Sequence, residues 1–149
     1  AEYGVPLQGL IALIHAESGF NPNAVRRGVW PDVSGGFSQM IVLTAAGYGI
    51  GDGTSDPANV EAVLAALQDR ETGIRLAATH FAKCLAVVDQ RFPSASGDER
   101  IILALRAYNA GAGYGLTEDY AQKYASHIAA YKGALALTYQ VLANKGWPV

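Results

Sequence analysis

The stretch "LIALIHAESGFNPNAV", Leu10 to Val25, places a carboxylate where an apolar side chain is expected. Its apolar residues recur at the spacing of an amphipathic helix, and Pro6 is where such a helix would begin. At about 100° per residue, Glu17 projects between Leu13 and Ile14, inside the apolar face. Glu17 also falls in the last helical turn, where the helix dipole opposes a negative charge.

A carboxyl group in an apolar face is shifted toward its neutral form by desolvation, and the helix C-terminus adds to this effect. A raised pKa leaves part of the carboxyl protonated near neutral pH, which is what a general acid requires. A carboxylate at a helix end can instead bend outward into water and have no catalytic role. The sequence pattern alone therefore leaves two alternatives for Glu17: a catalytic acid, or a solvent-facing carboxylate with no catalytic role.

The composition is that of a compact globular protein. Of the 149 residues, 50% are hydrophobic and 16% charged, so we expect one domain over residues 1–149 with a sizeable core. The net charge is −2 and no basic block is present, so nucleic acid is not an expected partner. No apolar run approaches the ~18 residues of a membrane span. The chain opens with Ala1 and shows no signal peptide, so we expect a mature form or an excised domain. We also expect the domain to be monomeric.

Cysteine and histidine usage argues against a metal or redox site. The sequence has a single cysteine, Cys84, which excludes an intrachain disulfide and a thiolate cluster. Its context, "HFAKCLAVV", predicts a buried structural thiol. His15, His80 and His127 are isolated from one another, and no HExxH motif is present. We expect no metal and no cofactor.

The periodicity predicts an all-α chain with at most a small β element. The segment 21–36 has no helical period and favours a short strand or hairpin. Residues 58–71 and 72–92 are expected to form two helices, or one long helix weakened at Gly73. Asp98 is placed to N-cap a helix over 99–111, with Gly111 in the C′ position. The remaining expected helices cover 6–18, part of 37–49, 118–131 and 133–144.

Two further motifs bear on chemistry. In "GGFSQM", Gly35 to Met40, a tight Gly-Gly turn precedes the polar pair Ser38 and Gln39 in an apolar setting. In "AYNAG", Ala107 to Gly111, Tyr108 falls on an apolar helix face, so its ring should be buried and its hydroxyl needs a partner. Each motif alone is more often structural than functional.

In this order, the segments resemble the soluble lytic transglycosylase and goose-type lysozyme family. The family's "ES", "xxNP", "GLMQ", "TA" and "AYNAG" motifs correspond here to Glu17-Ser18-Gly19-Phe20-Asn21-Pro22, Gly36-Phe37-Ser38-Gln39, Thr44-Ala45 and Ala107-Tyr108-Asn109-Ala110-Gly111. The segment "YAQKYASHIAAY" places Tyr124 at the family's tyrosine and Tyr131 at its terminal one. The resemblance covers about Leu7 to Tyr131 and implies a lysozyme-like fold.

The resemblance implies a role for each matching residue. Glu17 would be the single acid/base that cleaves the β-1,4 bond between N-acetylmuramic acid and N-acetylglucosamine, forming a 1,6-anhydro product. Tyr108 and Tyr124 would support it, with both hydroxyls near Glu17. The residues implied to hold sugar groups or the local backbone are Ser18, Ser38, Gln39 and Asn109, and Trp30 could stack on a sugar ring. The partner would be peptidoglycan glycan strands, and the location extracytoplasmic: periplasm, cell wall or phage virion.

Departures from the family pattern keep alternatives open. Ser38 stands where the family has Met, Gly73 where it has Asn, and His80 where it has Tyr; Ser34 could replace a family serine. One alternative is a goose-type hydrolase in which Asp32 activates water, with the two carboxylates ~6.5–9.5 Å apart. The other is a non-catalytic wall-binding or virion structural module, which would have no need of a buried acid.

Overall fold

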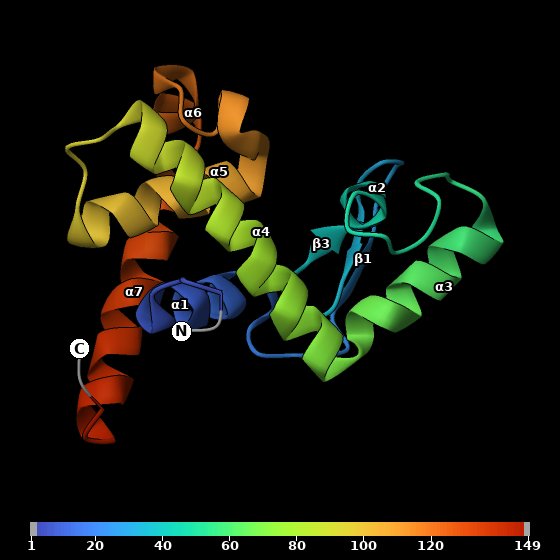
Figure 1. Cartoon of the computed structure of the whole chain (residues 1–149), viewed down its shortest axis with the longest axis horizontal. Coiled ribbons are helices and arrows are strands. Elements are labelled where there is room, and N and C mark those ends of the chain that lie inside the picture. The colour runs from blue at the N-terminus through green and yellow to red at the C-terminus, as the bar shows by residue number, and fades with distance from the viewer. Residues whose placement is uncertain (1–2, 148–149) are drawn as a thin grey trace. The chain divides into compact units, whose positions relative to one another are not determined.

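The computed structural model describes residues 3–147, and its contacts divide the chain into two compact units (Figure 1). We call Glu17–Ala77 the sheet unit, and Ala1–Ala16 with Ala78–Val149 the helical unit. The described residues form mostly helices with one small sheet, so the predicted all-α class with a minor β element is confirmed. Ala1, at which we expected a mature or excised chain to begin, lies outside the described residues. Among residues 3–147, no helix has the length and apolar character to cross a membrane.

The sheet unit contains three short antiparallel strands in the order β1-β2-β3. They are β1 (Val25–Arg27), β2 (Val33–Gly35) and β3 (Met40–Ile41), and they are followed by α2 (Val42–Ala46) and α3 (Pro57–Gln68). The predicted hairpin is confirmed. The third strand replaces the start of the short helix expected over 37–49. There Gly36 and Gln39 adopt positive φ values of 72° and 45°, which turn the chain back so that Met40 pairs with Gly35.

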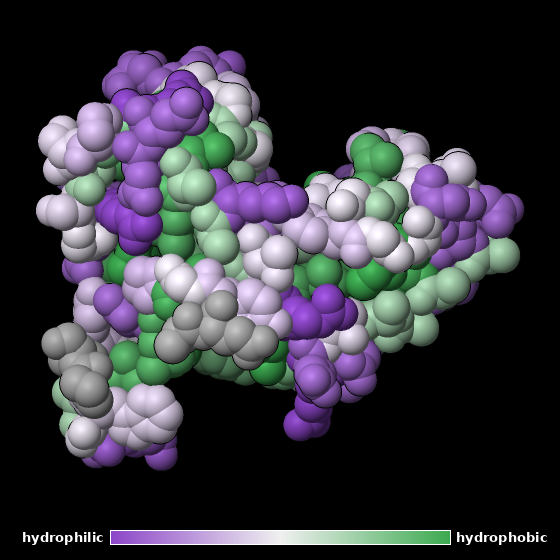
Figure 2. All heavy atoms as spheres, viewed as in Figure 1, coloured by the Kyte–Doolittle hydropathy of each residue, from purple (hydrophilic) through white to green (hydrophobic). Residues whose placement is uncertain are grey.

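The core of the sheet unit forms between the sheet, α2 and α3. Its buried side chains are Val33, Met40, Val42, Ala45, Val63, Leu64, Leu67 and Leu76. Gly36 is required in this packing because a Cβ there would lie 1.8 Å from the Leu67 carbonyl oxygen. The outward side of α3 carries the exposed Ala58, Ala62 and Ala65, and Figure 2 shows a pale green strip of moderate hydropathy over this helix.

The prediction of two helices over residues 58–92 is confirmed, and the alternative of one long helix weakened at Gly73 was wrong. The break after α3 falls at Asp69, two residues earlier than expected. Helix α4 (Arg70–Arg91) begins at the next residue and continues through Gly73, which is buried. The Asp69 side chain accepts hydrogen bonds from the backbone N–H and the hydroxyl of Thr72, at 3.0 and 2.8 Å. Asp69 therefore acts as an N-cap, and the cap, more than the glycine, sets the boundary.

The helical unit contains most of α1 (Leu7–Ser18), the second half of α4, α5 (Gly97–Tyr114), α6 (Glu118–Lys123) and α7 (Ala125–Asn144). Gly9 in α1 packs on Phe81, since a Cβ there would lie 2.9 Å from the phenyl ring. The Cys84 thiol is free and buried as predicted, and burial raises its pKa to about 12.

Helices α5 and α7 pack against each other, and the Tyr139 hydroxyl donates to Asp98 between them. Between them lies an open cavity of about 580 Å³. Its lining contains both aliphatic and charged side chains: Asp98, Glu99, Ile102, Leu103, Arg106, Ile128, Lys132, Leu135, Ala136 and Tyr139.

Two predicted helix boundaries in this unit were wrong. Ser96, not Asp98, is the N-cap of α5, and Asp98 lies inside the first turn, where it accepts the Tyr139 hydroxyl. The last two helices separate at Tyr124 (φ −116°, ψ 33°) and not near Gly133, which α7 includes. At this break the Tyr124 ring stacks on Tyr120 and His127, contacts that helix propensity does not record. Gly111, predicted to follow a helix end, interrupts α5 with φ 82° and ψ 151°.

Candidate functional site

Glu17 lies at the end of α1 with its carboxyl group partly enclosed. Burial raises the pKa of this carboxyl from its ordinary 4.5 to about 7, the direction predicted from the helix periodicity. Directly after it, Gly19 and Phe20 both adopt positive φ, 59° and 63°, and the Asn21 N–H bonds the Ser18 carbonyl at 3.1 Å. This tight reversal ends the helix immediately beyond Glu17. Near pH 7 the carboxyl is present in both protonation states, so it can donate and accept a proton.

Gln39 makes three hydrogen bonds within the sheet unit. Its Nε2 donates to the carbonyls of Ala24 and Gly36, each at 3.0 Å. Its Oε1 accepts from the hydroxyl of Ser34, which is buried, at 3.1 Å. Ala24 precedes β1 and Gly36 follows β2, so the carboxamide ties the two ends of the hairpin together.

Ser38 is fully buried in the same turn. Its Oγ accepts the Met40 backbone N–H at 3.1 Å, at the start of β3. This geometry favours the second role considered for Ser38, holding the local backbone. A contact between its hydroxyl and a sugar stays a prediction.

Asp32 lies on the connection between β1 and β2, where it pairs with Arg26. The Asp32 Oδ2 accepts hydrogen bonds from Arg26 Nε at 3.0 Å and from Nη2 at 2.8 Å. The connection is also closed by a 2.8 Å bond from the Gly28 N–H to the Asp32 carbonyl. Trp30 is half-buried against the core of the sheet unit, so only part of its indole is open to a sugar ring.

The "AYNAG" motif lies in the last regular turns of α5, in the helical unit. The half-buried ring of Tyr108 meets His80 edge-on, with 5.0 Å between centroids. Burial, together with the charge of Lys83, lowers the pKa of His80, which favours its neutral form. His80 appeared isolated in the sequence, and this contact on Tyr108 was missed because it joins α4 to α5.

Asn109, the next residue, is exposed and held at one end. Its Oδ1 accepts the hydroxyl of Tyr120 at 2.9 Å. Tyr120 itself is fully buried, and the Arg106 guanidinium lies 5.4 Å from the centre of its ring. Neither Tyr120 nor Arg106 was a sequence candidate.

Tyr124 belongs to an aromatic cluster around Tyr120. Its ring, 39% exposed, stacks on Tyr120 at 5.0 Å and on His127 at 5.3 Å. Tyr114 meets Tyr120 edge-on at 5.8 Å. The i,i+4 spacing of Tyr120 and Tyr124 was the available sequence signal, because such residues are neighbours on a helix surface.

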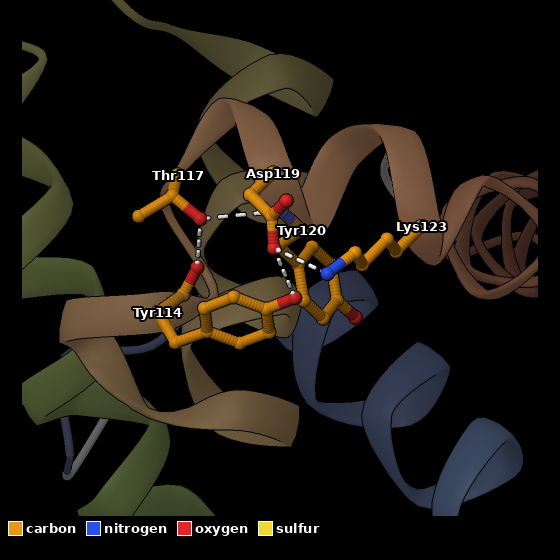
Figure 3. A network of polar contacts seen from close by, with 5 residues as sticks. All are labelled: Tyr114, Thr117, Asp119, Tyr120 and Lys123. Atoms are coloured by element: carbon orange, nitrogen blue, oxygen red, sulfur yellow. Dashed lines mark hydrogen bonds and ion pairs between the residues drawn. The ribbon is translucent and has the colours of Figure 1, made fainter.

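A polar network borders the cluster (Figure 3). The Tyr114 hydroxyl donates to Asp119 Oδ2 at 2.8 Å, and the same oxygen pairs with the Lys123 ammonium at 3.4 Å. The hydrogen bond to Asp119 is the main reason the pKa of Tyr114 is raised to about 12, so its hydroxyl stays protonated.

The structure thus gathers the predicted residues into two groups. The sheet unit holds Glu17 and the Gln39 turn, and the helical unit holds the "AYNAG" end of α5 with the tyrosine cluster. The predicted approach of the Tyr108 and Tyr124 hydroxyls to Glu17 stays a prediction. Among residues 3–147, no group of acidic, histidine and cysteine side chains is arranged to hold a metal ion.

Comparison with known proteins gives one clear result. The model of the Transglycosylase SLT domain matches residues 1–132, a range that includes Glu17, Gln39 and the whole "AYNAG" motif. No curated protein and no solved structure matches the chain. Proteins with this domain are typically peptidoglycan lytic transglycosylases, so the family relation supports peptidoglycan as the substrate. The chain belongs to the transglycosylase SLT domain family.

Proposed function

We propose that this chain is a peptidoglycan lytic transglycosylase in which Glu17 is the single catalytic acid/base. The observation that carries the proposal is the carboxyl of Glu17, whose pKa burial raises to about 7. A group titrating near neutral pH can deliver a proton in one step and accept one in the next. A module that only binds the cell wall has no need of such a group.

The proposed reaction uses Glu17 twice. The protonated carboxyl first donates to the glycosidic oxygen as the bond from C1 of N-acetylmuramic acid breaks, and N-acetylglucosamine leaves with its O4 protonated. The acetamido group of the muramic residue stabilises the developing positive charge at C1. The Glu17 carboxylate then accepts the proton of the C6 hydroxyl while O6 bonds to C1. The 1,6-anhydro ring closes, water is not consumed, and Glu17 is again protonated.

The other residues are assigned supporting roles. Tyr108 and Tyr124 orient and neutralise the site, and Asn109, Ser18 and Trp30 contact the sugars. Gln39, Ser34 and Ser38 hold the hairpin turn, since their hydrogen bonds run within the sheet unit. Residues 1–149 act as one monomeric catalytic domain on glycan strands outside the cytoplasm.

The product tests this function directly. Purified peptidoglycan treated with the protein should release muropeptides ending in 1,6-anhydro-muramic acid, lighter by one water than hydrolytic products and without a reducing end. Mass analysis before and after borohydride reduction separates the two classes, because only reducing ends gain hydrogen. Reducing-end products would replace the proposal with a hydrolase. Unchanged peptidoglycan would replace it with a binding module.

A further inference from the structure

We propose that Tyr120 is a positioning residue that orients the Asn109 carboxamide, so that its NH2 group donates to carbonyl or hydroxyl oxygens of the glycan. The inference rests on the proposed function and deepens it, because it assigns one substrate contact to one end of one side chain. Tyr120 acts through Asn109 and does not itself touch the substrate.

The hydrogen bond between the two residues fixes which end of the amide faces outward. A carboxamide has an acceptor end and a donor end that differ little in shape. The Tyr120 hydroxyl donates to Oδ1 at 2.9 Å, which holds the acceptor end against the protein. Asn109 is exposed, and its NH2 group is the end left for a ligand. The groups that fit it are oxygen acceptors, above all the carbonyl of an N-acetyl group.

The position of the Tyr120 hydroxyl is set by several independent contacts. The ring is fully buried under the Arg106 guanidinium, which donates to the carbonyls of Gly115 and Thr117 at 2.9 Å each. The Thr117 Oγ1 accepts the Tyr120 backbone N–H at 3.2 Å and caps α6. Backbone and ring are both held, so the hydroxyl is preorganised to select one orientation of Asn109.

Other residues of the aromatic cluster also bury the Tyr120 ring. Tyr124 stacks on the ring. Tyr114 lies edge-on to it, and the hydroxyl of Tyr114 is held by Asp119, which also pairs with Lys123 (Figure 3). A tyrosine enclosed in this way could serve packing alone. The test must therefore separate packing from orientation.

The test measures binding without turnover. In the Glu17→Gln background, the affinity for a tetrasaccharide of N-acetylglucosamine is followed by NMR, including the side-chain NH2 signals of Asn109. Tyr120→Phe should weaken binding about three- to tenfold, the effect of one lost hydrogen bond. Asn109→Ala should weaken it as much, and the double variant no further, because Tyr120 acts through Asn109. Tyr139→Phe, which loses a hydroxyl bonded to Asp98 in the same unit, should leave affinity unchanged.

Several results would overturn the proposal. They are additive losses in the double variant, an affinity of Tyr120→Phe equal to that of its parent, and no binding of the tetrasaccharide by the Glu17→Gln protein.

If Tyr120→Phe does not fold, Asn109→Asp gives the same information. It keeps an acceptor for Tyr120 but replaces the NH2 group with oxygen, and unchanged affinity would contradict the assignment. In the wild-type background, Tyr120→Phe should raise KM with kcat nearly unchanged. If the wild type does not cleave peptidoglycan, the proposed function is refuted. The affinities of the single and double variants test the role of Tyr120 independently of cleavage.

Discussion

Gln39 and Asn109 are both carboxamides of the family's motifs, but their hydrogen bonds differ. In the sheet unit, both ends of Gln39 bond to the protein, to two carbonyls and one hydroxyl. In the helical unit, Asn109 is exposed and accepts the Tyr120 hydroxyl at its Oδ1 end. We call a carboxamide a brace where both of its ends are hydrogen-bonded within the protein, as in Gln39. We call it a presented group where one end is held by the protein and the other faces solvent, as in Asn109, because that end can bind a ligand.

This difference separates what each residue should affect. A brace contributes to the free energy of unfolding, whereas a presented group contributes to ligand affinity. Glu17 is a third case, because its carboxyl is partly enclosed and burial raises its pKa. Ionisation of this carboxyl above neutral pH lowers the stability of the folded state. The same raised pKa supplies the proton for the proposed reaction.

The largest effect on activity is expected from replacing the Glu17 carboxyl with a carboxamide, the group that Gln39 and Asn109 carry. Glu17→Gln keeps size and hydrogen bonding but cannot deliver a proton, so the release of muropeptides should fall by about a thousandfold or more. The melting temperature should stay the same or rise. Glu71→Gln, on the exposed start of α4, is the matched control and should keep full activity. A Glu17→Gln protein that clears peptidoglycan at a tenth of the parent rate would show that another group is the acid.

The raised pKa predicts a pH dependence of both rate and stability. Cleavage needs the protonated acid, so kcat/KM should fall as the pH rises through about 7. The folded state holds a proton that the unfolded chain releases near 4.5, so this group's stabilising contribution is complete below about 4.5 and is lost as the pH rises through about 7. Denaturant unfolding of Glu17→Gln against wild type should show no gap near pH 4 and about 1–3 kcal/mol in favour of the variant above pH 7. A gap that is independent of pH would contradict the raised pKa.

Gln39 and Asn109 themselves should respond oppositely to truncation. Gln39→Ala removes three hydrogen bonds and leaves the Ala24 and Gly36 carbonyls with only their backbone N–H donors, so unfolding should require about 2–3 kcal/mol less. Asn109→Ala should cost below about 1 kcal/mol, since the side chain is exposed. Gln68→Ala, which loses one exposed hydrogen bond to the Asn23 carbonyl, controls for glutamine loss in the same unit. Equal destabilisation at positions 39 and 109 would remove the distinction between brace and presented group.

The parts of the fold that follow local rules were predictable. Helix α1 was expected over 6–18 from periodicity and Pro6, and it spans Leu7–Ser18. The raised pKa of Glu17 followed from the same periodicity. The division of residues 58–92 into two helices was also predicted, and the position of the break had a local signal, the Asp69 carboxylate three residues before Thr72.

What could not be predicted depends on contacts between elements. Strand β3 is two residues long and exists because Gln39 turns the chain back onto β2. The bond from Tyr120 to Asn109 joins α6 to α5, and the contact of His80 with Tyr108 joins α4 to α5. Nothing in the spacing of these residues indicates that the rings meet. The motifs identified the candidate residues, whereas tertiary packing decided which are braces and which are presented.

The tyrosines of the helical unit should show a smaller, catalytic effect. Tyr108→Phe and Tyr124→Phe keep the rings that pack on His80 and Tyr120, so the melting temperature should change little. Each lost hydroxyl should lower kcat by about three- to tenfold, the value of one hydrogen bond. Tyr139→Phe is the control for loss of a hydroxyl in this unit. Unchanged kcat in either variant would remove that tyrosine from the catalytic group and leave it with a packing role only.

The smallest effect is expected at Asp32, and it decides between the two ways of cleaving the glycan. A hydrolase needs a second carboxylate to activate water, whereas closure of the anhydro ring needs only one. The Asp32 carboxylate is engaged by Arg26 through two nitrogen atoms on the exposed hairpin. Asp32→Asn should therefore keep most of the wild-type rate, and loss of the ion pair should change stability by less than about 1 kcal/mol. Arg26→Gln removes the same pair from the other side, so matching stability changes would attribute any effect to the ion pair. If Asp32→Asn abolishes cleavage while Arg26→Gln does not, Asp32 is the base of a hydrolase, and its products should then carry reducing ends.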